Sequence, residues 1–189
     1  MKNILITGCA GFIGYNLTKY LLEKKYRIVG IDNLDNYYSV KLKRKRIDDL
    51  KKSKNFKFIK LDIKKRINIK KISYNFFLVI HLAAQAGVKS SVNNPRKTIL
   101  NNVNGFLEIL ELIKKKKIKN VIYASSSTVY GHNKIPFSED QKNNTPISIY
   151  GASKIANENM AYAYHNLYDI NFFGIRFFTV YGSSLRPDM

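Results

Sequence analysis

Three glycines, each separated by two residues, directly follow a short apolar run near the start of the chain. The run is NILIT (residues 3–7), and the glycines are Gly8, Gly11 and Gly14. A strand, a glycine-rich turn and a helix open the βαβ unit that binds dinucleotides, because glycine lets the backbone approach a pyrophosphate and the helix N-terminus favours its charge. The spacing is G-x-x-G-x-x-G rather than G-x-G-x-x-G, and a plain turn with a helix cap is the alternative interpretation.

The next apolar run ends in an acidic residue. RIVGI (residues 27–31) is followed by Asp32, eighteen residues after Gly14. A carboxylate at the end of the second strand accepts hydrogen bonds from the adenosine ribose and repels a 2′-phosphate. No arginine follows Asp32 directly. The sequence therefore favours NAD over NADP.

Strand-like and helix-like segments alternate along the whole chain. A long helix is predicted from Pro95 to about Lys117, and another carries Tyr150 and extends to about Tyr168. This alternation predicts an α/β fold, a Rossmann-like doubly wound parallel sheet of about six strands that forms a single domain over residues 1–189. The predicted strands are residues 3–7, 27–31, 56–61, 76–82, 120–124 and 171–178.

Two predicted strands end in segments suited to a binding site. The small residues of HLAAQAG (residues 81–87) let a flat cofactor lie against the backbone. SSSTVYG (residues 125–131) brings hydroxyl groups to the end of a central strand, where parallel α/β sheets place their chemistry. His81 is more typical of a satisfied core group, and with no second ligand nearby no metal site is expected. Asn102, within the long helix, is either an active-site hydrogen bonder or a surface residue.

Tyr150 and Lys154 lie four residues apart and share one face of the last predicted helix. A lysine ammonium close to a phenol lowers the phenol pKa, which makes a tyrosine usable as a general base. Of the Tyr-x-x-x-Lys pairs in the chain, only Tyr150/Lys154 comes after all three other features: the glycine turn, the strand-end acid and the serine cluster. This is the order along the chain that the fold demands. The same spacing occurs at Tyr15/Lys19, Tyr20/Lys24, Tyr37/Lys41 and Tyr130/Lys134.

The chain is strongly basic, with 33 Lys and Arg residues against 13 acids and a formal charge of +20. Such a charge either attracts an anionic partner or reflects solvated lysines in a chain that is also rich in Asn and Ile. The basic runs 43–45 and 114–117 lack interleaved aromatics, so no nucleic-acid partner is expected. The single Cys9 excludes an internal disulfide, and no apolar run reaches the length of a membrane span. We expect a cytoplasmic protein.

These features together resemble the extended short-chain dehydrogenase/reductase superfamily, in its NAD-dependent nucleotide-sugar epimerase branch. The local sequence is most similar to that of the UDP-glucuronate 4-epimerases, and the resemblance runs from end to end of the chain. The segments that carry it are DNLDNYYSVKLKRKR (32–46), HLAAQAGVKSS (81–91), NNVNGF (101–106), ASSSTVYG (124–131), PISIYGASKIANE (146–158), RFFTVYG (176–182) and RPDM (186–189).

The resemblance implies a catalytic set of Tyr150 as the base, Lys154 as its electrostatic partner and Ser126 as a hydrogen bonder to the reacting sugar oxygen. The NAD-binding residues that it implies are Gly8, Gly11, Phe12, Ile13, Gly14, Asp32, Asn33, Asp62, Ile63, Ala83, Ala84, Gln85, Tyr150 and Lys154. The residues that it implies for the UDP-sugar are Lys89, Asn102, Ser127, Thr128, Thr179 and Arg186.

The implied reaction inverts C4 of a UDP-hexuronate, converting UDP-glucuronate to UDP-galacturonate. The Tyr150 phenolate removes the 4-hydroxyl proton, the C4 hydride passes to NAD+, and the resulting 4-keto sugar turns over and takes the hydride back on its other face. A UDP-sugar decarboxylase or dehydratase of the same superfamily is an alternative, although Ser127-Thr128-Val129 offers no carboxylate for a dehydratase. A non-catalytic NAD-binding remnant is the alternative from another class.

Three features depart from the family pattern. Ser90 stands where an aromatic is usual, and Ser183-Ser184-Leu185 replaces a bulkier or glycine-containing segment. Family members also continue well beyond this length, with a C-terminal part that supplies most substrate contacts. We therefore expect a truncated chain that lacks the substrate domain, and a full-length form that is a homodimer.

Overall fold

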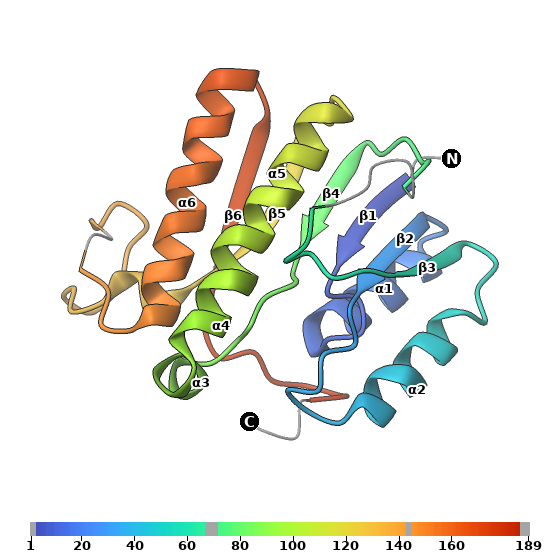
Figure 1. The fold of residues 1–189 in the computed structure, drawn as a ribbon, viewed down its shortest axis with the longest axis horizontal. Coiled ribbons are helices and arrows are strands. Elements are labelled where there is room, and N and C mark those ends of the chain that lie inside the picture. The colour runs from blue at the N-terminus through green and yellow to red at the C-terminus, as the bar shows by residue number, and fades with distance from the viewer. Residues whose placement is uncertain (1–2, 67–71, 143–144, 186–189) are drawn as a thin grey trace.

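The computed structural model describes residues 3–66, 72–142 and 145–185. Six strands form one sheet of order β3-β2-β1-β4-β5-β6, and every neighbouring pair is parallel (Figure 1). The predicted doubly wound α/β fold is therefore confirmed. The strands are β1 (Asn3–Thr7), β2 (Arg27–Asp32), β3 (Phe56–Lys60), β4 (Leu78–His81), β5 (Asn120–Ser126) and β6 (Asn171–Phe177).

The helix that was predicted as one segment from Pro95 consists of three joined parts with a π-helical turn in the middle. Two short helices, one α-helical and one 3₁₀, lie in stretches where no helix was predicted: Val88–Asn93 and Ser127–Tyr130. The helices are α1 (Phe12–Glu23), α2 (Val40–Leu50), α3 (Val88–Asn93), α4 (Pro95–Ile99), the π-helix η2 (Leu100–Asn104), α5 (Gly105–Lys115), the 3₁₀ helix η3 (Ser127–Tyr130) and α6 (Ile149–Tyr168).

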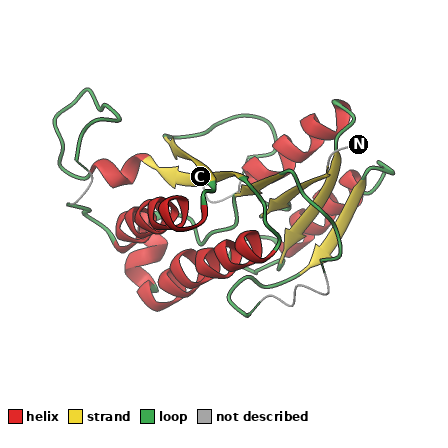
Figure 2. Ribbon diagram, turned by 90° about the horizontal axis from the view of Figure 1, so that it is seen from above, coloured by secondary structure: helices red, strands yellow, loops and turns green. Residues whose placement is uncertain are grey.

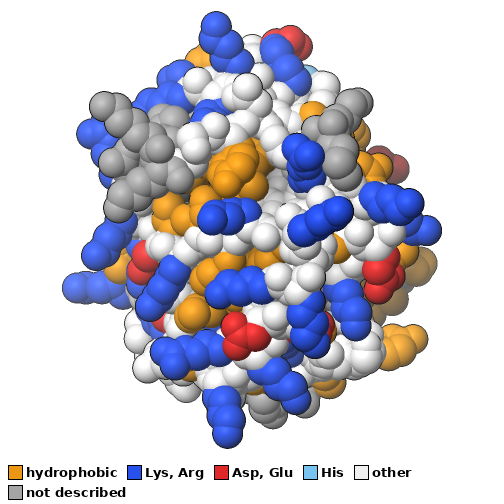
Figure 3. Space-filling model, turned by 90° about the vertical axis from the view of Figure 1, so that its right-hand side faces the viewer, with side chains coloured by type: hydrophobic (Ala, Val, Ile, Leu, Met, Phe, Trp, Pro, Cys, Tyr) orange, Lys and Arg blue, Asp and Glu red, His pale blue; other side chains and the backbone are white. Residues whose placement is uncertain are grey.

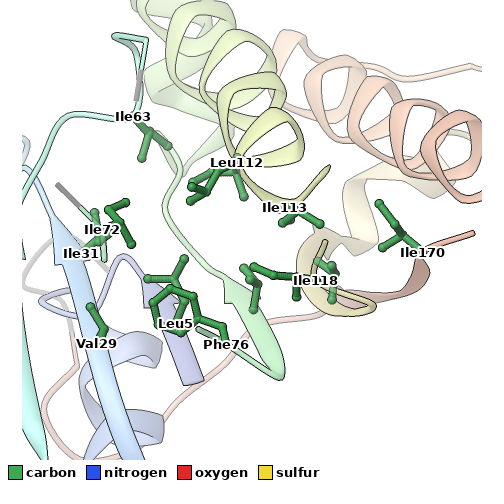
Figure 4. Close-up of a cluster of buried hydrophobic side chains, with 13 residues drawn as sticks. Leu5, Val29, Ile31, Ile63, Ile72, Phe76, Leu112, Ile113, Ile118 and Ile170 are labelled. Carbon is green, nitrogen blue, oxygen red and sulfur yellow. The ribbon is translucent and has the colours of Figure 1, made fainter. Parts of the chain in front are cut away.

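Helices cover both faces of the sheet because successive strand residues point to opposite sides. Leu5 of β1 belongs to a buried cluster with Ile109 and Ile113 of α5, whereas its neighbour Ile6 packs in a second cluster with Ile47 of α2. Figure 4 shows the first cluster between the strands and the helix α5. The view from above shows helices on both sides of the sheet (Figure 2). Alternating strand residues thus build two hydrophobic cores.

The two edges of the sheet differ in character. At the β3 edge, Lys and Arg side chains cover much of the surface around α2, with few acids among them (Figure 3). At the β6 edge, Phe173 and Ile175 keep 59% and 42% of their surface exposed. Their neighbour Phe172 faces the other side of the sheet, where it contacts the ring of Tyr123. Within the described ranges, no helix is long and apolar enough to cross a bilayer.

The strand order changes direction between β1 and β4. Thr7 at the end of β1 pairs with Ile31 of β2 on one side and with His81 of β4 on the other. The chain leaves β1 and β4 toward opposite faces, so a crevice opens beyond their carboxyl ends, and this is where open α/β sheets bind ligands. The fold therefore brings the glycine turn and the HLAAQAG segment to the same edge.

Candidate active site

A pocket of about 430 Å³ lies at the carboxyl edge of the sheet, within the size range of small-ligand sites. The segments that follow the first five strands line it, together with the first two turns of α6 and the segment after β6. The pocket thus brings together most of the residues singled out in the sequence. The predicted residues that line it are Gly8, Gly11, Phe12, Ile13, Gly14, Asp32, Asn33, Ile63, Ala83, Ala84, Gln85, Ser126, Ser127, Thr128, Tyr150, Lys154 and Thr179.

Three predicted residues of the described chain, Asp62, Lys89 and Asn102, do not line the pocket, and their binding roles stay predictions. The carboxylate of Asp62 accepts the backbone N–H of Lys64 at 3.0 Å and pairs with its ammonium at 3.4 Å. Lys89 is exposed on α3. Asn102 is 1% exposed and uses its amide in contacts behind the pocket wall, described below. Arg186 lies outside the described residues.

The glycine turn leaves no room for side chains. Gly8 has a φ of +74°, and a Cβ there would lie 2.8 Å from the backbone nitrogen of Ala83. A Cβ on Gly14 would lie 2.1 Å from the carbonyl oxygen of Gly8. The turn therefore folds tightly onto itself and onto β4, and α1 begins beside it with no side-chain cap. This bare cradle at a helix N-terminus fits the pyrophosphate of a dinucleotide.

Asp32 joins the glycine turn to the loop after β2. Its carboxylate accepts the N–H of Leu34 at 2.7 Å and the N–H of Ala10 at 3.1 Å, and burial raises its pKa. The carboxylate lines the pocket at the end of β2, where an adenosine ribose is held in this fold. The residues present therefore fit NAD at both its pyrophosphate and its ribose.

Lys43 lies beside Asp32 and was missed by the sequence reasoning. It lines the pocket, is 6% exposed, and donates to the carbonyl oxygen of Asp35 at 2.7 Å. Its ammonium lies 4.5 Å from the ring centroid of Tyr38, and burial lowers its pKa. Lys43 is one of many lysines on a basic helix, so no pattern in the sequence distinguishes it.

The first two turns of α6 project Tyr150 and Lys154 into the pocket. Ser148 caps the helix by accepting the N–H of Gly151 at 3.0 Å. Lys154 is 1% exposed, and its ammonium donates to the carbonyl oxygen of Ala124 at 2.8 Å. That ammonium lies 5.9 Å from the centroid of the Tyr150 ring. Burial lowers the pKa of Lys154 from 10.5 to about 8.

The hydroxyl cluster after β5 faces the same helix. The Oγ of Ser126 accepts from the hydroxyl of Thr128 at 3.0 Å and from its N–H at 3.3 Å. A Cβ on Gly151 would lie 2.9 Å from the carbonyl oxygen of Thr128. Close approach of backbone to backbone at this glycine therefore brings α6 against the turn that carries Ser126, Ser127 and Thr128.

Asn102, in the π-helical turn, acts as a clamp: its side-chain amide links the backbone of Gln85 to Ser153 of α6. Its Oδ1 accepts the N–H of Gln85 at 2.7 Å, and its Nδ2 donates to the carbonyl oxygen of Gln85 at 3.1 Å and to Ser153 Oγ at 3.0 Å. Ser153 in turn donates to the carbonyl oxygen of Tyr150 at 2.7 Å. Asn102 thereby fixes one wall of the pocket and the first turn of α6. Single π-helical turns are common beside functional sites.

His81 is a core residue, but only one of its ring nitrogens is satisfied. Its Nδ1 lies 2.8 Å from Thr7 Oγ1, and Nε2 has no hydrogen-bond partner within the described chain. Burial first, and then the charge of Lys154, lower its pKa to about 3. The imidazole is therefore neutral near pH 7.

A parallel sheet in which a glycine turn, a strand-end acid and a Tyr-x-x-x-Lys helix share one pocket defines a dinucleotide-binding protein of the Rossmann type. The chain belongs to the NAD dependent epimerase/dehydratase family, which it matches over residues 4–189. The predicted family and its cofactor, NAD, are thereby confirmed.

Relatives of known activity resemble the chain along its whole length. A UDP-glucuronate 4-epimerase of Thermodesulfobacterium geofontis is 44% identical, over 100% of this chain and 59% of the relative. The crystal structure of UDP-glucuronic acid 4-epimerase from Bacillus cereus, in complex with UDP-glucuronic acid and NAD, has a TM-score of 0.91 and 37% identity. That match covers 99% of this chain and 60% of the other. A UDP-glucose 4-epimerase from Thermus thermophilus, in complex with NAD, has a TM-score of 0.85 and 28% identity over 98% of this chain and 58% of the other. The chain therefore spans about 60% of the length of these relatives.

Proposed function

We propose that this chain carries the NAD-binding and catalytic groups of a UDP-hexuronate 4-epimerase, which interconverts UDP-glucuronate and UDP-galacturonate. The observation that carries the proposal is the convergence of Tyr150, Lys154 and Ser126 on the pocket that the glycine turn also lines. The similarity to UDP-glucuronate 4-epimerases, at 44% and 37% identity, supports this sugar over the UDP-glucose of a relative at 28%.

NAD would be held by the glycine turn at its pyrophosphate, by Asp32 at its adenosine ribose, and by the small residues after β4. When bound, it supplies a reversible hydride acceptor for the sugar C4. Lys154 would hold the nicotinamide ribose, since its ammonium is buried in the pocket wall beside Tyr150. Because each cycle returns the cofactor to its starting form, no second reductant is required.

Tyr150 would accept the proton of the sugar 4-hydroxyl. The Lys154 ammonium stabilises the phenolate by charge, and its effect is strengthened because the surroundings are buried and of low dielectric. Ser126 and Thr128 offer hydroxyls that hold the same sugar oxygen, so that the proton moves along a fixed line between the oxygen and Tyr150. Ser127 and Thr179 are proposed as further contacts of the UDP-sugar. On the return step Tyr150 gives the proton back.

A 4-epimerase is favoured over a dehydratase by the placement of the carboxylates. In the described part of the chain, the acids that line the pocket are Asp32, which ends β2, and Asp35, which follows it. A dehydratase needs a carboxylate beside the reacting carbons, at the Tyr150 end. A decarboxylase shares the base and the cofactor, so product analysis is the measurement that separates it from an epimerase.

The test compares Tyr150→Phe with Tyr20→Phe. Tyr20 also precedes a lysine by four residues, and the ammonium of Lys24 lies 5.4 Å from its ring centroid, but Tyr20 is 54% exposed on α1. NAD affinity by calorimetry should stay nearly unchanged in both variants. Formation of reduced cofactor on addition of UDP-glucuronate, and production of UDP-galacturonate in a chain extended to the length of its relatives, should disappear only in Tyr150→Phe.

Two results would overturn the proposal. One is epimerisation by the Tyr150→Phe variant, which would remove Tyr150 as the base. The other is a wild-type chain that binds no NAD but is retained on DNA with a steep salt dependence, which would indicate a nucleic-acid binder instead.

A further inference from the structure

An ion pair links α6 to β6 one turn beyond Lys154. The guanidinium of Arg176 donates from Nε to Glu158 Oε1 at 3.0 Å and from Nη2 to Oε2 at 2.9 Å. The two side chains are only 20% and 15% exposed. Two parallel hydrogen bonds fix both the distance and the orientation of the groups, unlike the single contact of a surface lysine. Glu158 also raises the pKa of the Arg176 guanidinium, which stays charged.

A third group binds the same carboxylate. Ser125 is 2% exposed and donates its hydroxyl to Glu158 Oε1 at 2.5 Å. Ser125 and Arg176 are directly paired across β5 and β6, so one carboxylate on the helix holds two neighbouring positions of the sheet. Ser125 immediately precedes Ser126, and both residues line the pocket.

Glu158 stands on the same face of α6 as the residues that line the pocket. Tyr150, Lys154 and Glu158 follow one another at intervals of four residues, close to one helical turn. Lys154 contacts the carbonyl oxygen of Ala124, and Glu158 contacts the hydroxyl of Ser125. One helix face is thus fastened to two consecutive residues of β5, and a helix is stiff over these two turns.

Arg176 also contacts the chain on the other side of the serine cluster. Its guanidinium lies 4.9 Å from the centroid of the Tyr130 ring, and Tyr130 ends η3. It donates as well to the carbonyl oxygen of Glu139 at 3.3 Å. The stretch from Ser126 to Thr128 is therefore held at Ser125 before it and at Tyr130 after it.

We propose that Glu158 and Arg176 are positioning residues for the catalytic groups. They set the register of α6 on the ends of β5 and β6, and thereby the distance between Tyr150 with Lys154 on the helix and Ser126 on the strand. Neither residue lines the pocket, so we assign both an effect through the groups that they hold in place. The consequence for catalysis rests on the proposed function, whereas the geometric part concerns Lys154 alone and is measurable without substrate.

The test measures how accessible Lys154 becomes. Wild type, Glu158→Gln and Arg176→Lys are labelled with an amine acylating reagent well below their melting temperatures, and each lysine is quantified by peptide mass spectrometry. Loss of one partner of a buried ion pair leaves the other charge uncompensated, so α6 should separate from β5 at Lys154. We expect the Lys154 labelling rate to rise about tenfold in Glu158→Gln, with a smaller rise in Arg176→Lys, and NAD affinity to fall about tenfold in Glu158→Gln.

Tyr164→Phe is the matched control on the same helix. It removes the 2.7 Å hydrogen bond from Tyr164 to Glu111 of α5, nearly three helical turns from Lys154 and outside the pocket. Its Lys154 labelling and NAD affinity should equal those of wild type. If Glu158→Gln only lowers the melting temperature and leaves both readouts unchanged, the ion pair is merely stabilising and the proposal is wrong. If wild type binds no NAD, the proposed function fails, while the labelling comparison still decides whether Glu158 and Arg176 hold α6 in place.

Discussion

The two ends of the pocket are built in different ways. At the end formed by β1 and β2, backbone atoms determine the shape: Gly14 packs against Gly8, and Asp32 binds two backbone N–H groups. At the end formed by β5 and α6, side chains determine the shape. Lys154 donates a hydrogen bond to a backbone carbonyl oxygen of β5, and Asn102 bonds the backbone of Gln85. The first end is therefore fixed by sterics and has no space for an added atom at Gly14. The second depends on buried polar groups and is sensitive to charge.

Gly14→Ala should have the largest effect, because it tests the steric end directly. The added Cβ would lie 2.1 Å from the Gly8 carbonyl oxygen, and no flexible side chain is there to give way. Gly11→Ala is the graded comparison, since its Cβ would lie 3.0 Å from the same oxygen. We expect Gly14→Ala to cost at least ~3 kcal/mol of unfolding free energy and to abolish NAD binding, with a clearly smaller loss for Gly11→Ala. Equal effects in denaturant titrations would mean that the turn yields more than its geometry indicates.

The pH dependence of the unfolding free energy tests the charged end of the pocket, because Lys154 titrates there. Its pKa is lowered to about 8 in the folded chain, against an ordinary value of 10.5. The unfolded chain therefore binds more protons between these values, so this group makes the unfolding free energy rise from about pH 8 to about pH 10.5. Below about pH 8 the full penalty of burying the ammonium is present, about 3 kcal/mol for the whole shift.

The measurement compares wild type with Lys154→Met across this pH range, since other lysines and tyrosines titrate there too. The difference between the two unfolding free energies should change in favour of wild type as the pH rises. A constant difference would show that Lys154 keeps an ordinary pKa, and that the Tyr150 end of the pocket is wetter than its burial implies.

The contrast between the two ends also explains what the sequence reveals. Gly8, Gly14 and Asp32 act through backbone atoms, which every residue type provides, so their own residue types and spacing carry the signal. The role of Asn102 depends on Gln85 and Ser153, which lie 17 and 51 residues away, and that of Arg176 on a carboxylate 18 residues away. Helical periodicity predicted a helix through Asn102 but not its π-helical turn, because periodicity carries no information on contacts between residues so far apart in sequence. Sequence therefore predicts the fold and the steric end well, and the side-chain network of the other end poorly.

Asn102→Ala should have an intermediate effect. It leaves both the N–H and the carbonyl oxygen of Gln85 without the partner that they have in wild type, in a buried place. Unsatisfied buried groups cost about 1–3 kcal/mol. Asn101→Ala is the control, because the hydrogen bond that Asn101 donates, to the carbonyl oxygen of Lys97 at 2.8 Å, lies within its own helical segment. We expect about 2 kcal/mol less stability for Asn102→Ala and under ~1 kcal/mol for Asn101→Ala, by urea unfolding. Similar losses in both would argue against a clamp.

Lys43→Met should have the smallest effect, and it asks whether the steric end has a charged component after all. The ammonium of Lys43 holds the Asp35 carbonyl oxygen and lines the pocket beside Asp32, whereas Lys45 is exposed on the same helix. Methionine keeps the apolar stem but loses the hydrogen bond and the charge. We expect this loss to weaken NAD binding by about 1 kcal/mol, or roughly fivefold in affinity. Lys45→Met, with the same loss of net charge, should leave the affinity within experimental error. If the two variants weaken binding equally, only the overall positive charge of the chain attracts NAD, and the adenosine end is held by backbone alone.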